Sequence, residues 1–202
     1  MSINHYNYIL FDIDGVLATA TNSADELLRE NNLTLSDFFE NWSNSETVAS
    51  FEAGKIDAIE FANKRQLELA LPIESEAIIN ILTSRKSVLF DGAEALLTDL
   101  ASRNINMACL SNTNILHWNS IIGKEVFHRF FCKEYLSYEL GLTKPSPDIY
   151  HYVLNDLHCE ANKLLYFDDS KKNIDAAIKI GISAVLVKDF NDLTEKLKNI
   201  IG

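Results

Sequence analysis

The chain has 202 residues, of which 47% are hydrophobic and 23% charged, so it is long enough for one domain with its own core, with or without an insertion. Its formal net charge of -11 disfavours nucleic acid and anionic membranes as partners. A phosphorylated ligand would meet the same repulsion, so a site for one needs its own local positive charge.

The first residues, MSINHYNYIL, lack the basic flank and the apolar stretch of a signal peptide, and no apolar run approaches the ~20 residues of a membrane helix. The three cysteines, Cys109, Cys132 and Cys159, cannot all pair and show no metal-type spacing. We therefore expect a cytoplasmic protein with reduced thiols.

Short apolar runs separated by helical patterns are the main fold signal. Each run is too short for a helix and is followed by polar or small residues, which is typical of buried parallel strands. The four clear runs are Tyr8–Phe11, Met107–Leu110, Leu164–Phe167 and Ala184–Val187, and Glu134–Tyr138 is a weaker fifth.

Helical periodicity fills the spaces between the later runs. We expect helices over residues 93–101, from Ser146-Pro147 to Leu157, from Asn173 to a stop at Gly181, and from Asp192 onward. The alternation of strands and helices predicts an α/β fold with a Rossmann-like, doubly wound parallel sheet.

Residues 18–86 interrupt this alternation. They contain no clear strand pattern, and helical patterns fall at residues 24–31, 35–41, 47–53, 59–71 and 74–83. We interpret this segment as an inserted all-helical cap, with residues 1–17 and 87–202 forming the core.

Carboxylates follow two of the predicted strands, where ligands bind in open α/β sheets. Asp12 and Asp14 come at the end of the first run, and Asp168 and Asp169 end the third. Such a cluster would be costly without a counter-charge, and Mg²⁺ prefers oxygen ligands of this kind. The pattern predicts a Mg²⁺ site formed by these four residues.

Two of these aspartates and four further residues suit phosphoryl chemistry. Asp12 is a candidate nucleophile, since aspartate forms aspartyl-phosphates, while Asp14 can turn towards a leaving group. Gly15 would let the backbone approach a phosphate closely. Ser111 and Asn112, after the second run, can donate hydrogen bonds to a phosphate, and Lys144, beside a proline, can supply the local positive charge.

Other polar and aromatic residues carry weaker signals. The five histidines, His117 among them, have no ligand-like spacing, and we expect them at the surface or in ordinary packing. Trp42 and Phe51 fall in the predicted cap, where packing between helices is the simpler interpretation, although they could contact a substrate.

Taken as a set, these motifs resemble the haloacid dehalogenase superfamily. The matching segments occur in the family's order: residues 9–16, residues 110–114, Glu139-Leu140-Gly141 with Lys144-Pro145, and residues 167–170. The insertion after the first strand is similar to the family's helical cap. Residues 51–56 and 110–114 are similar to bacterial sugar-phosphate phosphatases, including glucose-1-phosphate-type enzymes, some of which lack the second aspartate present here as Asp14.

The resemblance implies a function. Asp12 would attack phosphorus, Asp14 would act as general acid and then base, and Ser111 and Lys144 would bind the phosphoryl group. Asp12, the Asp14 carbonyl and Asp169 would hold Mg²⁺, with Asp168 as a further or indirect ligand. We therefore expect a Mg²⁺-dependent phosphatase acting on a small phosphorylated metabolite, such as a sugar phosphate, with the pKa of Asp14 raised by burial.

Three alternatives stay open at this point. A phosphomutase would share the same motifs, and a 2-haloacid dehalogenase would attack carbon without Mg²⁺. A non-catalytic binding protein would keep the fold but lose turnover. The sequence leaves the oligomeric state open.

Overall fold

The computed structural model describes residues 5–21, 24–84 and 86–201. The strands are β1 (Tyr8–Phe11), β2 (Ala18–Ala20), β3 (Ser87–Leu89), β4 (Asn106–Ser111), β5 (Ile121–Ile122), β6 (Phe131–Leu136), β7 (Leu164–Asp168) and β8 (Ser183–Leu186). The helices are α1 (Asp25–Glu30), α2 (Leu35–Phe38), α3 (Glu46–Glu52), α4 (Ala58–Glu68), α5 (Ser75–Ser84), α6 (Ala93–Ser102), α7 (Ile115–Ser120), α8 (Glu125–Phe130), α9 (Ser137–Leu140), α10 (Pro147–Asp156), α11 (Lys171–Ile180) and α12 (Phe190–Ile201), and two short 3₁₀ turns lie at Trp42–Asn44 and Ala161–Lys163.

The main sheet has the strand order β6-β4-β1-β7-β8, and all its neighbouring strands are parallel. Phe11, at the end of β1, lies level with Cys109 of β4 and Phe167 of β7. The residues that follow β1, β4 and β7 therefore meet at one edge of the sheet. The four clear apolar runs form strands, which confirms the predicted parallel sheet.

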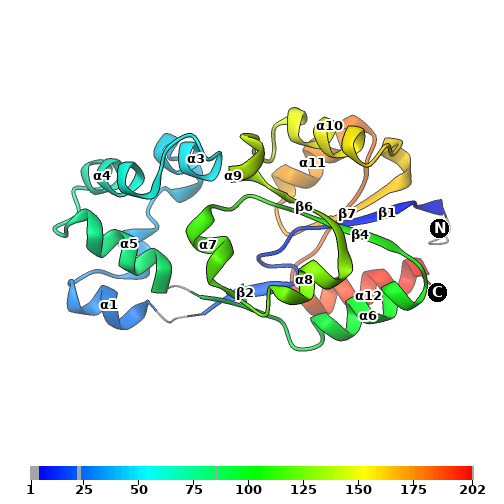
Figure 1. Cartoon of the computed structure of the whole chain (residues 1–202), viewed down its shortest axis with the longest axis horizontal. Helices are drawn as coiled ribbons and strands as arrows, with labels where there is room; N and C mark the ends of the chain where they lie inside the picture. Colours follow the sequence, from blue (N-terminus) through cyan, green and yellow to red (C-terminus); the bar gives the residue numbers. More distant parts are fainter. Residues whose placement is uncertain (1–4, 22–23, 85, 202) are drawn as a thin grey trace.

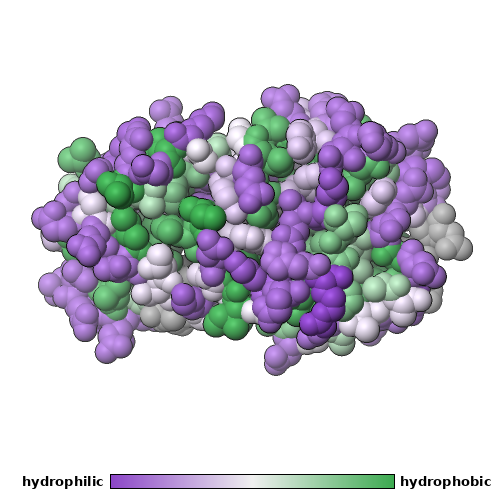
Figure 2. All heavy atoms as spheres, viewed as in Figure 1, coloured by the Kyte–Doolittle hydropathy of each residue, from purple (hydrophilic) through white to green (hydrophobic). Residues whose placement is uncertain are grey.

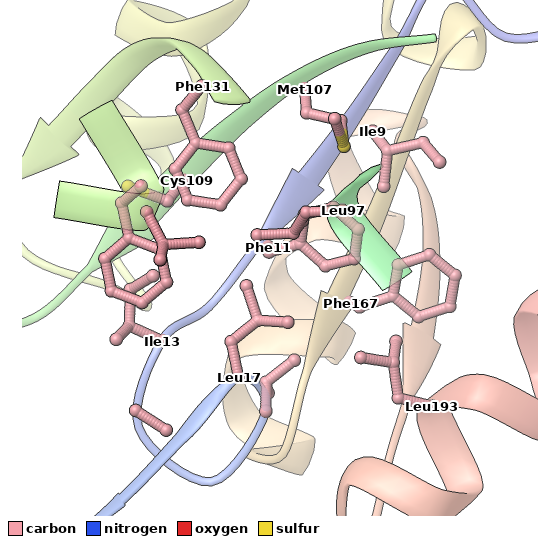
Figure 3. Close-up of a cluster of buried hydrophobic side chains, with 14 of the residues drawn as sticks. Ile9, Phe11, Ile13, Leu17, Leu97, Met107, Cys109, Phe131, Phe167 and Leu193 are labelled. Carbon is pink, nitrogen blue, oxygen red and sulfur yellow. The ribbon is translucent and has the colours of Figure 1, made fainter. Parts of the chain in front are cut away.

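Helices cover both faces of this sheet, with α10 and α11 on one side and α6, α8 and α12 on the other (Figure 1). Successive residues of β1 point to opposite faces, so Ile9 and Phe11 join one core cluster and Leu10 joins the other. Figure 3 shows Phe11 and Phe167 among Leu97 of α6 and Leu193 of α12. Burial on both faces explains why these strands read as continuous apolar runs.

The helices α1, α3, α4 and α5 gather at the left of Figure 1, far from both chain ends. We call residues 24–84 the helical lobe. It has its own apolar core, which includes Phe38, Phe51 and Phe61. In the described part of residues 18–86, helices α1–α5 follow β2, so the all-helical prediction is wrong at Ala18–Ala20. Strand β2 pairs antiparallel with β3, and β3 also pairs with β5.

Several element boundaries differ from the sequence prediction, and β6 and α2 are two examples. The weak fifth run was placed too late, because β6 ends at Leu136 and the next residues form α9. The Ser137 hydroxyl bonds the backbone of Thr113, a tertiary contact that redirects the chain there. Helix α2 ends at Phe38 rather than near Asn41, which adopts a left-handed conformation with φ 52°.

Figure 2 shows that hydrophilic residues predominate on the face in view, with hydrophobic side chains visible between them in the left half, over the helical lobe. In the described part of the chain, the helices are too short or too polar for a membrane-spanning segment.

Candidate active site

A buried lysine lies between two carboxylates at the carboxyl edge of the sheet. Lys144 Nζ is 2.9 Å from Asp12 Oδ1 and 2.8 Å from Asp168 Oδ2, and it also donates to the Leu110 carbonyl at 3.0 Å. The Lys144 side chain is 2% exposed and that of Asp168 is fully buried. One cation therefore ties together the ends of β1, β4 and β7.

Burial and the neighbouring charges shift the pKa values of the ionisable groups at this edge. Burial raises the pKa of Asp12 well above its usual range, and the Asp168 charge adds to this while Lys144 opposes it. Burial would also lower the pKa of Lys144, but the Asp12 and Asp168 carboxylates outweigh it and raise that pKa. Lys144 is therefore held as a cation.

Asp168 is fixed by donors on both oxygens. Ser170 N–H donates to Oδ1 at 2.7 Å, and Asn173 Nδ2 lies 3.0 Å from each oxygen. The Tyr166 hydroxyl donates to Oδ2 in addition to Lys144. Although burial opposes ionisation, Lys144 and these donors lower the pKa of Asp168. Asp168 is thus an ionised, rigid anchor for the lysine.

The loop after β1 brings Asp14 over the sheet edge. Asp14 Oδ2 lies 2.7 Å from His117 Nε2, and Ser87 Oγ donates to Oδ1 at 3.1 Å. Gly15 has φ +80°, and a Cβ there would lie only 2.4 Å from Asp169 Oδ2. The glycine therefore allows the loop to pass directly against Asp169.

The residues after β4 take different places. Ser111 is the last residue of β4 and is buried. The Asn112 side chain is used to hold Lys144, since Nδ2 donates to the Lys144 carbonyl and Oδ1 accepts from the Lys144 N–H, both at 2.8 Å. Its side-chain amide thus positions the lysine, and its backbone N–H is the simpler donor for a phosphate.

A cavity at this end of the sheet is lined by Asp14, Asn112 and Asp169 among others. Its volume of about 490 Å³ falls within the ~300–1,000 Å³ usual for small-molecule sites. The sheet edge and the helical lobe both contribute to its walls. The residues lining it are Asp14, Gly15, Thr19, Ala20, Phe39, Trp42, Glu52, Leu82, Asn112, Thr113, Asn114, His117 and Asp169. Its size suits a compact organic molecule.

Comparison with known proteins agrees with this geometry. Residues 6–181 match the model of the haloacid dehalogenase-like hydrolases. The chain belongs to this family. Among curated relatives, it is similar to a D-ribitol-5-phosphate phosphatase of Bacteroides thetaiotaomicron, with 30% identity over 50% of this chain. That match spans 52% of the relative's own length.

Solved structures of haloacid dehalogenase-like enzymes share the fold. A family enzyme of Bacteroides thetaiotaomicron in a magnesium complex superposes with a TM-score of 0.77 at 24% identity, covering 96% of this chain and 99% of that one. An L-2-haloacid dehalogenase also superposes, with a TM-score of 0.72 at 14% identity over 98% of this chain and 100% of that one. The fold is therefore shared with an L-2-haloacid dehalogenase as well as with a magnesium-bound family enzyme, so the side chains rather than the fold must decide the reaction.

The carboxylates of this haloacid dehalogenase-like hydrolase suit a hard divalent cation. Asp12, Asp168 and Asp169 can each offer a carboxylate oxygen within 4.8 Å of the others. Burial, followed by the Asp168 charge, also raises the pKa of Asp169. Burial thus penalises the ionisation of Asp12 and Asp169, and a cation such as Mg²⁺ stabilises carboxylates of this kind.

The lining of the cavity includes His117, Trp42 and Glu52, which were not predicted from the sequence as site residues. His117 was expected at the surface or in packing, and this was wrong because it contacts Asp14. Trp42 lines the cavity, whereas Phe51 packs in the core of the helical lobe as expected. Glu52 was not predicted as a site residue, although it lies within residues 51–56, the segment that resembles sugar-phosphate phosphatases.

Proposed function

We propose that this hydrolase is a Mg²⁺-dependent phosphatase that cleaves a small phosphomonoester, such as a sugar phosphate, through an aspartyl-phosphate on Asp12. The observation that carries the proposal is the buried Lys144 ammonium, 2.9 Å from Asp12 Oδ1, at a sheet edge where Asp168 and Asp169 supply further carboxylates. Residues 18–86 are proposed to act as a cap over a core of residues 1–17 and 87–202.

A cation at this edge would be held by the carboxylates of Asp12 and Asp169 and the carbonyl of Asp14, with Asp168 orienting the cluster through Lys144. When bound, Mg²⁺ neutralises charge on the phosphoryl oxygens and on the attacking carboxylate. Lys144 adds the local positive charge that a chain of net charge -11 needs in order to accept an anion.

The reaction has two steps. An Asp12 oxygen forms a bond to phosphorus while the bond from phosphorus to the ester oxygen breaks, and Asp14 gives its proton to the departing alcohol. Asp14 then takes a proton from water, which attacks phosphorus, releases phosphate and regenerates the Asp12 carboxylate. Ser111 and the Asn112 N–H are proposed to bind the phosphoryl oxygens.

The surroundings of Asp14 support its assigned role. Its side chain is 39% exposed and lines the cavity, so it can meet a leaving group, while His117 and Ser87 hold its two oxygens. A dehalogenase would use Asp12 to attack carbon but would leave Asp14 and the Asp168-Asp169 pair without a task, because that attack needs neither Mg²⁺ nor protonation of an alcohol. The local chemistry therefore favours phosphate esters.

The test is phosphate release from sugar phosphates, nucleotides and simple phosphomonoesters, with Mg²⁺ and with EDTA, for the wild type and Asp12→Ala. Mg²⁺-dependent release that disappears in Asp12→Ala is the expected result. Phosphorus NMR of the products separates hydrolysis from transfer between hydroxyls of one sugar. Isomerised sugar phosphate in place of free phosphate, or chloride release in EDTA, would overturn the proposal.

A further inference from the structure

Glu52 is an acidic side chain that the reaction described above does not use. It ends α3 and lines the cavity, opposite the sheet edge that carries Asp14 and Asp169. Its side chain is half-buried, and Trp42 Nε1–H donates to its Oε1 at 3.2 Å. A carboxylate that is partly desolvated beside a ligand cavity is costly to ionise unless hydrogen bonds or nearby charges stabilise it.

The position of Glu52 relative to the core is fixed through its backbone. Ser137 Oγ donates to the Glu52 carbonyl at 2.6 Å and also bonds the backbone of Thr113, another residue lining the cavity. Two residues later, Gly54 approaches so closely that a Cβ there would lie 2.1 Å from the Tyr138 carbonyl oxygen. The helical lobe and the core are therefore in direct contact beside Glu52.

The indole that bonds Glu52 is held by its own neighbours. The ring of Trp42 lies 4.8 Å from that of Phe39 and 5.9 Å from that of Phe61, centroid to centroid. The guanidinium of the fully buried Arg65 lies 5.6 Å from the same indole. With Arg65 already on Trp42, the indole is a rigid donor to Glu52 rather than an open surface for a cationic ligand.

The charge around the cavity restricts what can lie near Glu52. Among the described residues that line it, His117 is the one that can carry positive charge, and it is paired with Asp14. Burial raises the pKa of Glu52, and the Trp42 hydrogen bond and the charges of Lys144 and His117 only partly offset this. A second anionic group on a substrate would be repelled here, whereas a hydroxyl could donate to the carboxylate.

We propose that Glu52 is a specificity-determining residue that accepts a hydrogen bond from a hydroxyl of the leaving group. The substrate is then the monophosphate of a neutral, polyhydroxylated alcohol, and bisphosphates and phosphorylated carboxylic acids are rejected. This inference rests on the proposed phosphatase function. It adds a residue that binds the part of the substrate farthest from phosphorus.

The experiment compares kcat/KM of wild type and Glu52→Gln on three esters: ribitol phosphate, phenyl phosphate and phosphoglycerate. Glutamine keeps the shape and an acceptor for Trp42 but removes the charge. Because a hydrogen bond to a charged acceptor is stronger than one to a neutral acceptor, kcat/KM for ribitol phosphate should fall about fivefold. Phenyl phosphate, without hydroxyls, should be unaffected, and phosphoglycerate should be hydrolysed faster by the variant.

Glu46→Gln is the matched control, since Glu46 is an exposed residue in the first turn of the same helix and the charge change is identical. It should leave all three esters unchanged. An equal change for all three esters in Glu52→Gln, or no change in any, would overturn the inference. A preference of the wild type for phosphoethanolamine would also overturn it, since the Glu52 carboxylate would then be binding a cationic group of the substrate.

Failure of the inference and failure of the proposed function give different results. If the wild type hydrolyses none of the esters in the presence of Mg²⁺, the phosphatase proposal fails. If it hydrolyses phenyl phosphate but shows no preference that depends on Glu52, only the assignment of Glu52 fails.

Discussion

The core and the helical lobe, which both contribute residues to the cavity, handle buried charge in opposite ways. On the core side, Lys144 compensates Asp12 and Asp168 at 2.9 and 2.8 Å, and Asp168 is hydrogen-bonded on both oxygens. On the lobe side, Glu52 has an indole N–H as its partner, while the buried Arg65 bonds the carbonyls of Phe38 and Glu40 instead. On the proposed function, the core side is organised in advance for phosphoryl transfer, and the lobe side keeps an acceptor for the rest of the substrate.

The largest expected effect comes from removing the charge of Lys144, the cation that Asp12 and Asp168 share. Lys144→Met leaves Asp12 and Asp168 buried without a counter-charge, which should cost about 3–5 kcal/mol of unfolding free energy and abolish activity. Urea-induced unfolding measures it. Lys171→Met is the control, because Lys171 pairs with Asp175 on the surface, where a pair contributes about 0–1 kcal/mol. Equal losses in the two variants would contradict the role given to Lys144.

Asp14→Asn should lower kcat by roughly 10²–10⁴ with little change in KM, since the amide cannot move a proton but keeps the shape of the side chain. Steady-state kinetics on the best ester measures this. Ser87→Ala removes only the hydrogen bond to Asp14 Oδ1 and should cost about 1 kcal/mol in activation free energy. Unchanged kcat in Asp14→Asn would disprove the acid–base assignment.

The core and the helical lobe also differ in how a glycine approaches its neighbour. Gly15→Ala would place Cβ 2.4 Å from the Asp169 carboxylate, a movable side chain, so it should raise the Mg²⁺ concentration needed for half-maximal activity. Gly54→Ala would place Cβ 2.1 Å from the Tyr138 backbone oxygen, so it should separate lobe and core and raise KM. Mg²⁺ titrations and KM values separate the two effects.

Gly141→Ala is the control for this pair. Gly141 also has positive φ, +70°, but a Cβ there would meet nothing within 4 Å. All three variants should lose about 1–2 kcal/mol of stability from the left-handed backbone alone. If Gly141→Ala alters KM or the Mg²⁺ requirement as much as the others, close approach is not the cause.

The smallest expected effect is a gain in stability from Glu52→Gln. Burial raises the pKa of Glu52 in the folded chain, so the folded state holds this proton more tightly than the unfolded state. Ionised Glu52 therefore lowers stability above its raised pKa, and the cost disappears as the pH falls through that pKa. The variant should be slightly more stable than wild type at neutral pH and equal to it in acid, as measured by urea unfolding. A variant less stable at neutral pH would contradict this.

Much of the core side could be predicted from local sequence. A buried parallel strand needs a continuous apolar run, so Tyr8–Phe11 and Leu164–Phe167 were recognisable, and the aspartates after them had to lie at the sheet edge. Lys144 was predictable only through its place beside a proline and the family resemblance. The position of β6 was misjudged because Ser137 is fixed by a distant residue, Thr113.

The sequence by itself determined the strand ends, because apolar periodicity and the chemistry of the next few residues are local properties. Only the tertiary structure decided which side chains face the cavity across the gap between lobe and core. His117 meets Asp14 and Glu52 meets Trp42 through the packing of helices and loops. The Asn112 side chain likewise forms hydrogen bonds with the Lys144 backbone because two loops lie side by side. Such contacts depend on how elements pack in three dimensions, and no periodicity along the chain encodes them.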